Sequence, residues 1–196
     1  MSRIPLIIAV AVLLSACGGR EFSAPRNLDD ACAMQSERPK YFAAMRASER
    51  KWGIPLAVQA AIIHAESRFI GDAQTPVRYA LGVIPLGRQS SALGYSQALD
   101  GTWDEYRRET GNRRADRTDI RDATDFVGWY SNKTRERNGI ALNDARNQYL
   151  AYHDGHTGFA RGTYNSKPWL LQVADRVASR SVMYDQQLRN CRSGWW

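Results

Sequence analysis

Helix start and stop signals punctuate most of this chain, whereas alternating strand patterns are scarce. Prolines or capping residues such as Asp119 precede apolar-periodic segments, and glycines such as Gly53 and Gly139 follow them, as expected where helices begin and end. The expected helical segments are 39–52, 55–66, 102–109, 119–138, 143–154 and a last one that starts near 166 and carries apolar residues to 177. These signals predict an all-α domain.

The stretch from 71 to 93 interrupts this pattern, because it contains Pro76, Pro85 and three glycines. A connection of this length without helical periodicity is usually functional. We therefore expect an ordered loop excursion between residues 71 and 93 that faces the substrate.

An acidic residue, Glu66, ends the second expected helix on an apolar face. The residues three and four before it are Ile63 and Ile62, so the carboxylate shares a helical face with aliphatic side chains. Burial and the partial negative charge of a helix C-terminus both raise a carboxyl pKa. A carboxylic acid that is protonated near neutral pH can donate a proton to a leaving group. Taken alone, a helix-end glutamate that turns to water is the simpler interpretation.

The N-terminus has the features of an export signal. Arg3 precedes an apolar stretch, 4–14, that is far shorter than the roughly 20 residues of a membrane-spanning helix. The following residues, 14–17, resemble the bacterial lipoprotein signal, in which the cysteine, here Cys17, is acylated and becomes the first mature residue. Gly18 in second place resembles the default for outer-membrane sorting in a two-membrane bacterium. The alternative is an ordinary signal peptide with a chance cysteine.

The cysteine and histidine content predicts a disulfide and no metal site. Without the signal, two cysteines remain, Cys32 and Cys191, and an isolated pair in an oxidising compartment is more often bridged than free. The alternative is two buried, unpaired thiols. Only His153 and His156 hint at metal-ligand spacing. We therefore expect neither a metal nor a cofactor.

The expected organisation is a signal peptide (1–16), a short lipidated tether (17–28) and one domain (29–196), whose size suffices for a core. The net charge of the whole chain is +7, and losing Arg3 with the signal lowers it by one to +6. A basic protein outside the cytoplasm favours anionic partners such as cell-wall polymers or lipid headgroups. The export signal disfavours nucleic acid.

Three segments carry the most specific signal. They are ESRFIGDA at 66–73, GYSQALDGTW at 94–103 and AYHDG at 151–155. In this order they resemble the motifs of the lytic transglycosylase family with a soluble lytic transglycosylase (SLT), lysozyme-like domain, and the resemblance covers residues 50 to 180. The departures from the family pattern are glycine for proline at Gly71, Tyr95 and Ser96 for Leu-Met, and His153 and Asp154 for Asn-Ala.

The resemblance implies a lysozyme-like single domain, with the 71–93 excursion beside its active-site groove. It also implies cleavage of the β-1,4 bond between N-acetylmuramic acid and N-acetylglucosamine in peptidoglycan, with formation of 1,6-anhydro-muramic acid ends. Glu66 is the implied catalytic residue, first as acid and then as base toward the C6 hydroxyl of the sugar. The implied substrate-binding residues are Ser67, Tyr95, Gln97 and Tyr152.

Gln97 is implied to bind amide or hydroxyl groups of the sugar, and the Tyr152 hydroxyl to orient Glu66. The alternative for Tyr152, which spacing alone does not exclude, is a core tyrosine with a satisfied hydroxyl. The expected location is the cell envelope, lipid-anchored through Cys17 and facing the periplasm, with any partner in the envelope machinery unidentified.

Two other functions are weighed against this one. A muramidase that adds water needs a second carboxylate, for which Asp72 and Asp100 are the candidates. A non-catalytic peptidoglycan-binding lipoprotein needs none. Retention of Glu66, Gln97 and Tyr152 together speaks against this last alternative, because binding alone requires no buried acid.

Overall fold

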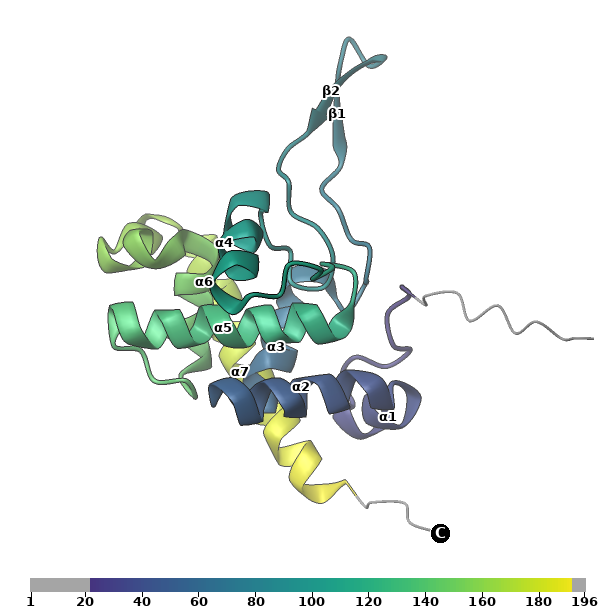
Figure 1. Ribbon diagram of the computed structural model, residues 1–196, viewed down its shortest axis with the longest axis vertical. Helices are drawn as coiled ribbons and strands as arrows, with labels where there is room; N and C mark the ends of the chain where they lie inside the picture. Colours follow the sequence, from purple (N-terminus) through teal and green to yellow (C-terminus); the bar gives the residue numbers. More distant parts are fainter. Residues whose placement is uncertain (1–21, 192–196) are drawn as a thin grey trace, which may run out of the picture.

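The computed structural model describes residues 22–191, so the expected signal peptide (1–16) and the expected lipid-attachment residue Cys17 lie outside the described residues. The described chain is mostly helical, with one two-stranded antiparallel sheet (Figure 1). Its elements are α1 (Ala31–Glu37), α2 (Pro39–Trp52), α3 (Leu56–Ser67), β1 (Val77–Ala80), β2 (Ile84–Arg88), α4 (Asp100–Thr110), α5 (Ile120–Asn138), α6 (Ala145–Ala160), the 3-10 helix η1 (Thr163–Ser166) and α7 (Pro168–Asn190). The prediction of an all-α domain is confirmed. Within residues 22–191, none of the helices is long and apolar enough to cross a bilayer.

Several helix ends follow the sequence punctuation. α2 begins at Pro39 and is ended by Gly53, which has φ 82°. Asp119 caps α5 by accepting a hydrogen bond from Arg121 N at 2.8 Å, and Gly139 ends this helix with φ 70°. Positive φ is unfavourable for residues with a Cβ, so glycine lets the chain leave each helix without strain.

Other boundaries differ from those expected. α6 continues past Gly155, whose φ of 73° and ψ of 159° put a kink inside the helix instead of an end. Its cap is Asp144, which accepts from Asn147 N at 3.1 Å, rather than the expected Asn143. The short helix α1 was not predicted, although Asp30 caps it by accepting from two backbone N–H groups of its first turn.

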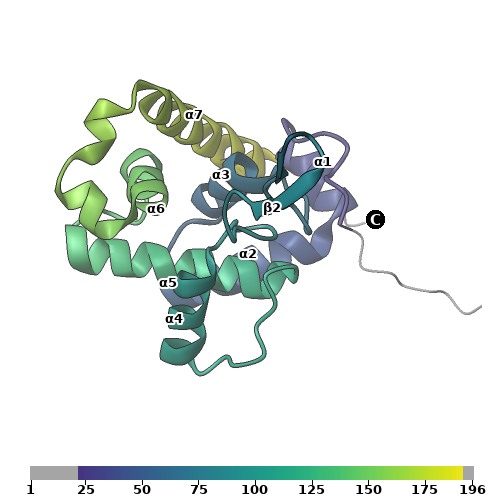
Figure 2. The same ribbon diagram turned by 90° about the horizontal axis from the view of Figure 1, so that it is seen from above.

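Helix α3 is the centre of the core. Its residues 56–63 are all buried, on every side of the helix, as in a helix enclosed by others. It contacts α2, α5, α6 and α7, and Figure 2 shows it between α7 and α2. Each fully buried aliphatic side chain contributes about 1.5–3 kcal/mol to stability. The C-terminal turn of α3 is therefore held in a fixed position.

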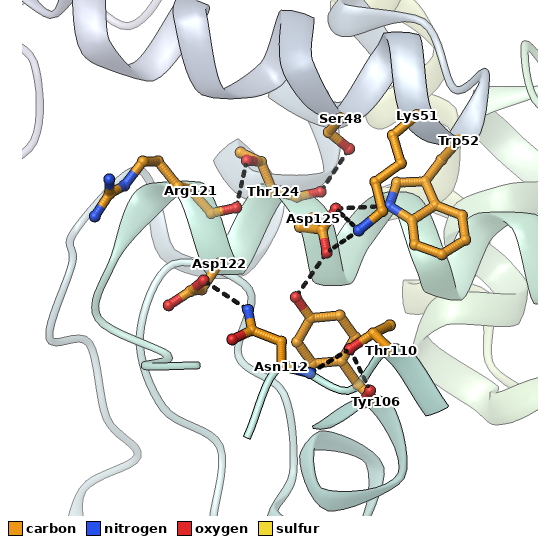
Figure 3. A network of polar contacts seen from close by, with 10 residues as sticks. All are labelled: Ser48, Lys51, Trp52, Tyr106, Thr110, Asn112, Arg121, Asp122, Thr124 and Asp125. Atoms are coloured by element: carbon orange, nitrogen blue, oxygen red, sulfur yellow. Dashed lines mark hydrogen bonds and ion pairs between the residues drawn. The ribbon is translucent and has the colours of Figure 1, made fainter. Parts of the chain in front are cut away.

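Asp125 on α5 joins three helices. Its carboxylate accepts hydrogen bonds from Lys51 Nζ at 2.9 Å and Trp52 Nε1 at 2.8 Å on α2, and from the Tyr106 hydroxyl at 2.8 Å on α4 (Figure 3). Three residues further along α5, a Cβ on Gly128 would come within 2.4 Å of the Trp52 ring. The close approach of α2 and α5 therefore requires glycine there, and Asp125 fixes α4 against this pair.

The N-terminal end of the described chain is fastened to the domain. Residues 22–28, expected as part of the tether, lie against it. Gly71 N donates to Phe22 O at 2.9 Å, and the Tyr184 hydroxyl on α7 donates to Leu28 O at 2.5 Å. This segment is therefore a part of the packed structure.

Residues 71–93 form the expected ordered excursion, as a β-hairpin. β1 and β2 pair in antiparallel fashion, and Figure 1 shows the hairpin projecting from the helical body. Isolated bridges at its base join Gln74 to Leu93 and Leu93 to Ala98. The strands were not predicted, because a proline and a register shift break the alternation that marks a strand.

Cys32 and Cys191 form a disulfide across 159 positions of sequence, which confirms the expected pairing. The bond links α1 to the residue that follows α7. It closes a covalent loop around most of the domain.

Reducing the Cys32–Cys191 disulfide should lower the melting temperature, because the cross-link restricts the unfolded chain. For so long a loop the chain-entropy account gives about 5 kcal/mol. Thermal unfolding with and without reductant measures the change, and the Cys32→Ser/Cys191→Ser variant should match the reduced protein. Two titratable thiols in the unreduced, denatured protein would contradict the pairing.

Candidate active site

Glu66 lies in the last turn of α3, one residue before the helix ends. Ile62 and Ile63, which share its helical face, are 0% exposed. Burial raises the pKa of the Glu66 carboxyl to about 7. Glu66 as a whole residue keeps partial exposure. Glu66 is therefore poised between its acid and base forms near neutral pH.

Tyr149 on α6 is the polar neighbour of Glu66. Its hydroxyl hydrogen-bonds the Glu66 carboxyl, which favours the ionised form and partly opposes the larger effect of burial. Burial and the adjacent Glu66 raise the pKa of Tyr149 far above its usual value, so the hydroxyl stays a donor. Tyr149 was not among the site residues expected from the sequence. The available signal was its spacing of three residues from Tyr152, which places both on one helical face.

Tyr152 has a different partner from the one expected. Its hydroxyl donates to Ser96 O at 2.7 Å, whereas the hydrogen bond to Glu66 comes from Tyr149. Burial, and then the nearby Glu66 charge, raise the pKa of Tyr152 well above its usual value. α6 thus places two tyrosines near the acid. One contacts the carboxyl, and the other holds the backbone of the loop that contains Ser96.

Ser67 and Gln97, both expected to bind substrate, hold this loop in place. Ser67 Oγ is buried and donates to Tyr95 O at 2.8 Å. Gln97 has φ 49° and donates from Nε2 to Ala73 O at 2.9 Å and to Gly94 O at 2.8 Å. Within residues 22–191, no donor contacts Gln97 Oε1. The amide nitrogen of Gln97 is therefore structural, and its carbonyl oxygen is open to a ligand.

Gly71, which stands where the family pattern has proline, is explained by its contacts. Its N–H donates to Phe22 O at 2.9 Å. A Cβ at this position would lie 2.6 Å from the Phe22 ring and 2.7 Å from the Tyr95 hydroxyl oxygen. Proline supplies neither the donor nor the space. This departure therefore accompanies the packing of residues 22–28 against the loop after Glu66.

Tyr95, expected to contact the saccharide, points into the core. It is 3% exposed, and its hydroxyl shares a hydrogen bond with the Tyr41 hydroxyl at 2.8 Å. The neighbouring Ser96 is 0% exposed. In this structure both departures from Leu-Met therefore change the packing beneath the loop, and neither side chain is presented to solvent.

The two candidate second carboxylates lie in other environments. Asp72 is exposed, and Asp100 pairs with Arg117 at 2.8 Å. Among residues 22–191, no acidic group contributes to the pKa shift of Glu66. Burial alone accounts for the rise.

The two histidines of α6 contact different partners. His153 Nδ1 lies 3.5 Å from Asp154 Oδ1, whereas His156 Nε2 lies 3.0 Å from Thr134 Oγ1 and its ring stacks on Tyr130. Within the described part of the chain, no group of three or more His, Cys, Asp and Glu side chains is placed to hold a metal ion.

His64, two residues before Glu66, faces a separate cavity of about 480 Å³ between α3 and α7. Burial, Arg180 and Arg68 lower its pKa to about 4, so the imidazole is neutral at pH 7. It does not contribute to the pKa shift of Glu66. His64 is therefore close to Glu66 in the sequence without influencing the charge of its carboxyl.

The family model described as "Transglycosylase SLT domain" matches residues 5–191. The chain belongs to this family, and its all-α domain is lysozyme-like. Membership makes it a transglycosylase-type enzyme that acts on peptidoglycan in the cell envelope. No curated protein sequence matches the chain.

The buried Glu66 should make stability depend on pH. Its pKa is about 7 in the folded protein against an ordinary value of 4.5, so the folded state binds the proton more tightly and loses stability as pH rises from about 4.5 through about 7. Glu66→Gln removes this loss. The stability of the variant minus that of wild type should therefore be about 3 kcal/mol larger at pH 8 than at pH 4.

Urea denaturation at the two pH values measures the effect. Glu136→Gln, which changes an exposed glutamate on α5, is the matched control. Its difference in stability from wild type should be the same at both pH values. A Glu66→Gln difference that is the same at both pH values would contradict the raised pKa.

Proposed function

We propose that this protein is a lytic transglycosylase that cleaves the β-1,4 bond between N-acetylmuramic acid and N-acetylglucosamine and leaves 1,6-anhydro-muramic acid ends. The observation that carries the proposal is the single carboxyl of Glu66, which is desolvated to a pKa of about 7 in a partly exposed residue at the end of the buried helix α3.

A pKa near the working pH suits both halves of the proposed reaction. Protonated Glu66 first gives its proton to the glycosidic oxygen, and the bond from that oxygen to C1 of the muramic acid breaks through an oxocarbenium-like transition state. The Glu66 carboxylate then takes the proton of the C6 hydroxyl, whose oxygen bonds to C1. The proton count balances and no water is consumed.

The two tyrosines of α6 have separate proposed roles. The Tyr149 hydroxyl stabilises the carboxylate that exists between the two proton transfers. Tyr152, through Ser96 O, holds the loop whose Gln97 Oε1 is open to an amide or hydroxyl donor of the sugar. Ser67 acts through the same loop by its bond to Tyr95 O.

The electrostatics of the site favour this lyase over a muramidase. A hydrolase needs a second carboxylate roughly 5–9.5 Å from the acid. Among the described residues, no acidic group influences the pKa of Glu66, and Asp100 is paired with Arg117. The C6 hydroxyl is already part of the bound substrate, which gives it an entropic advantage over captured water.

The location proposed for the enzyme follows from the sequence at 14–17. A lipid on Cys17 would anchor the protein to the outer membrane, where the domain faces the periplasm and its glycan substrate.

Mass analysis of digested peptidoglycan tests the reaction. Muropeptides should end in 1,6-anhydro-N-acetylmuramic acid, lighter by one water than the hydrolytic product. Glu66→Gln should abolish cleavage while the protein stays folded, because the amide cannot deliver a proton. A predominance of reducing ends would favour the muramidase, and turnover by Glu66→Gln like that of wild type would exclude the mechanism.

Paired tyrosine variants test the division of roles. Tyr149→Phe removes a hydrogen bond that lowers the Glu66 pKa, so the alkaline limb of the rate profile should move to higher pH. Tyr152→Phe should lower the rate roughly 10²-fold by loosening the loop, with the limb unmoved. The pH dependence of the rate is measured for wild type and the two variants. Alkaline limbs at the same pH for wild type and Tyr149→Phe would refute the role of Tyr149.

A further inference from the structure

The end of the β1–β2 hairpin gathers most of the exposed apolar side chains. We call residues 79–86 the hairpin tip. Among residues 22–191, nine large hydrophobic side chains are exposed, and five of them belong to the tip. They are Tyr79 (56%), Leu81 (90%), Val83 (76%), Ile84 (52%) and Leu86 (59%). The tip stands away from the helical body (Figure 1), so no other part of the described chain covers these side chains.

Leu81, in the turn at the tip, combines an unfavourable backbone conformation with high exposure. Val83 N donates to Ala80 O at 3.1 Å, and the two residues between them, Leu81 and Gly82, have φ 50° and 75°. A turn with positive φ at both central positions favours Asn, Asp or Gly at the first of them. Leu81 instead carries backbone strain and 90% exposure. The exposure of this large apolar side chain points to an apolar environment that this structure does not include.

The charges around the tip have one sign. Arg78 and Arg88 flank it on the two strands, and they are the only charged residues in the interval 73–99. Both are exposed, and long arginine side chains reach a polar surface while their stems lie along apolar material. The hairpin is apolar at its tip, has two arginines beside the tip and has no acidic residue in this interval. It therefore complements an anionic surface that has an apolar interior.

We propose that the hairpin tip inserts into the interfacial layer of a bilayer that contains anionic lipid. The pairing of the two strands satisfies the backbone groups that face the partner strand, and the hydrated interfacial layer, unlike the hydrocarbon interior, can hydrogen-bond the groups on the two outer edges. Apolar side chains enter the boundary of the acyl chains, and each arginine near the headgroups gains electrostatic attraction. The aliphatic character of the tip fits lipid better than a glycan strand, which is bound by aromatic faces and polar groups.

The hairpin base lies beside the candidate active site. Gln97 Nε2 donates to Ala73 O, and the bridges of Leu93 to Gln74 and Ala98 continue the connection. Seven residue steps separate Gln74 from Leu81, or roughly 23 Å when extended. Insertion of the tip would therefore hold the Gln97 loop at about this height above the bilayer. The contact is independent of cleavage and of a lipid on Cys17.

An environment-sensitive fluorophore on Leu81→Cys tests insertion in the full-length protein, in which Cys17→Ser removes the other free thiol and the expected lipid site, and the Cys32–Cys191 disulfide is left oxidised. Vesicles of phosphatidylglycerol and phosphatidylethanolamine should shift the emission to the blue and brighten it about threefold. Nitroxide lipids in the bilayer should quench it. Phosphatidylcholine vesicles should have a much smaller effect. The matched control carries the fluorophore on Val182→Cys, at a position that is 57% exposed on α7, and should not respond.

A second pair of variants measures the contribution of the tip to binding. Leu81→Asp/Val83→Asp should weaken the response of a fluorophore at position 84 to anionic vesicles about tenfold or more. Val182→Asp should leave it unchanged, and circular dichroism checks that both variants are folded. Absence of any vesicle response from the tip would overturn the proposal. A response to isolated peptidoglycan alone, or to protein concentration without vesicles, would overturn it in favour of a glycan or a second copy. Equal responses to both kinds of vesicle would refute the role of the arginines.

Discussion

Removal of water from the C-terminal turn of α3 is the constraint on which the site depends. Four helices enclose α3, and Ile62 and Ile63 leave Glu66 with too little solvent to ionise at its ordinary pKa. The same enclosure fixes the position of the carboxyl, because a helix packed on all sides has little freedom to shift. Core packing and catalytic tuning are therefore one property of this helix.

Backbone carbonyls, more than side-chain pairs, hold the rest of the site. Ser67, Gln97 and Tyr152 all donate to carbonyl oxygens of the loops beside α3, at 2.7 to 2.9 Å. Such bonds position a loop whatever side chains it carries. This tolerance explains how Tyr95 and Ser96 depart from the family pattern, with both side chains buried, while the loop keeps its place.

The sequence was informative where local chemistry decides the structure. Gly53 and Asp119 marked helix ends, and the run before Glu66 indicated a buried acid. Two kinds of feature needed coordinates. The choice between Tyr149 and Tyr152 depends on side-chain direction on one helical face, which spacing cannot distinguish. The strands β1 and β2 lack the usual alternation because Pro85 and a register shift interrupt it, so their pairing could be seen only in the structure.

Gly71 gives the N-terminal segment a mechanical connection to the site. Gly71 lies five residues after Glu66, and its N–H donates a hydrogen bond to Phe22 O. A few residues after Phe22, Leu28 O accepts hydrogen bonds from Tyr184 and Arg180 on α7. A pull on the chain before Phe22 thus acts on the loop that follows the acid, on Glu37 and Arg38 through Arg26 and Ser23, and on α7. The share carried by α7 is resisted by a long, packed helix. The share carried by Gly71 rests on one hydrogen bond, so load at the N-terminus would distort the catalytic loop before it disturbed the core.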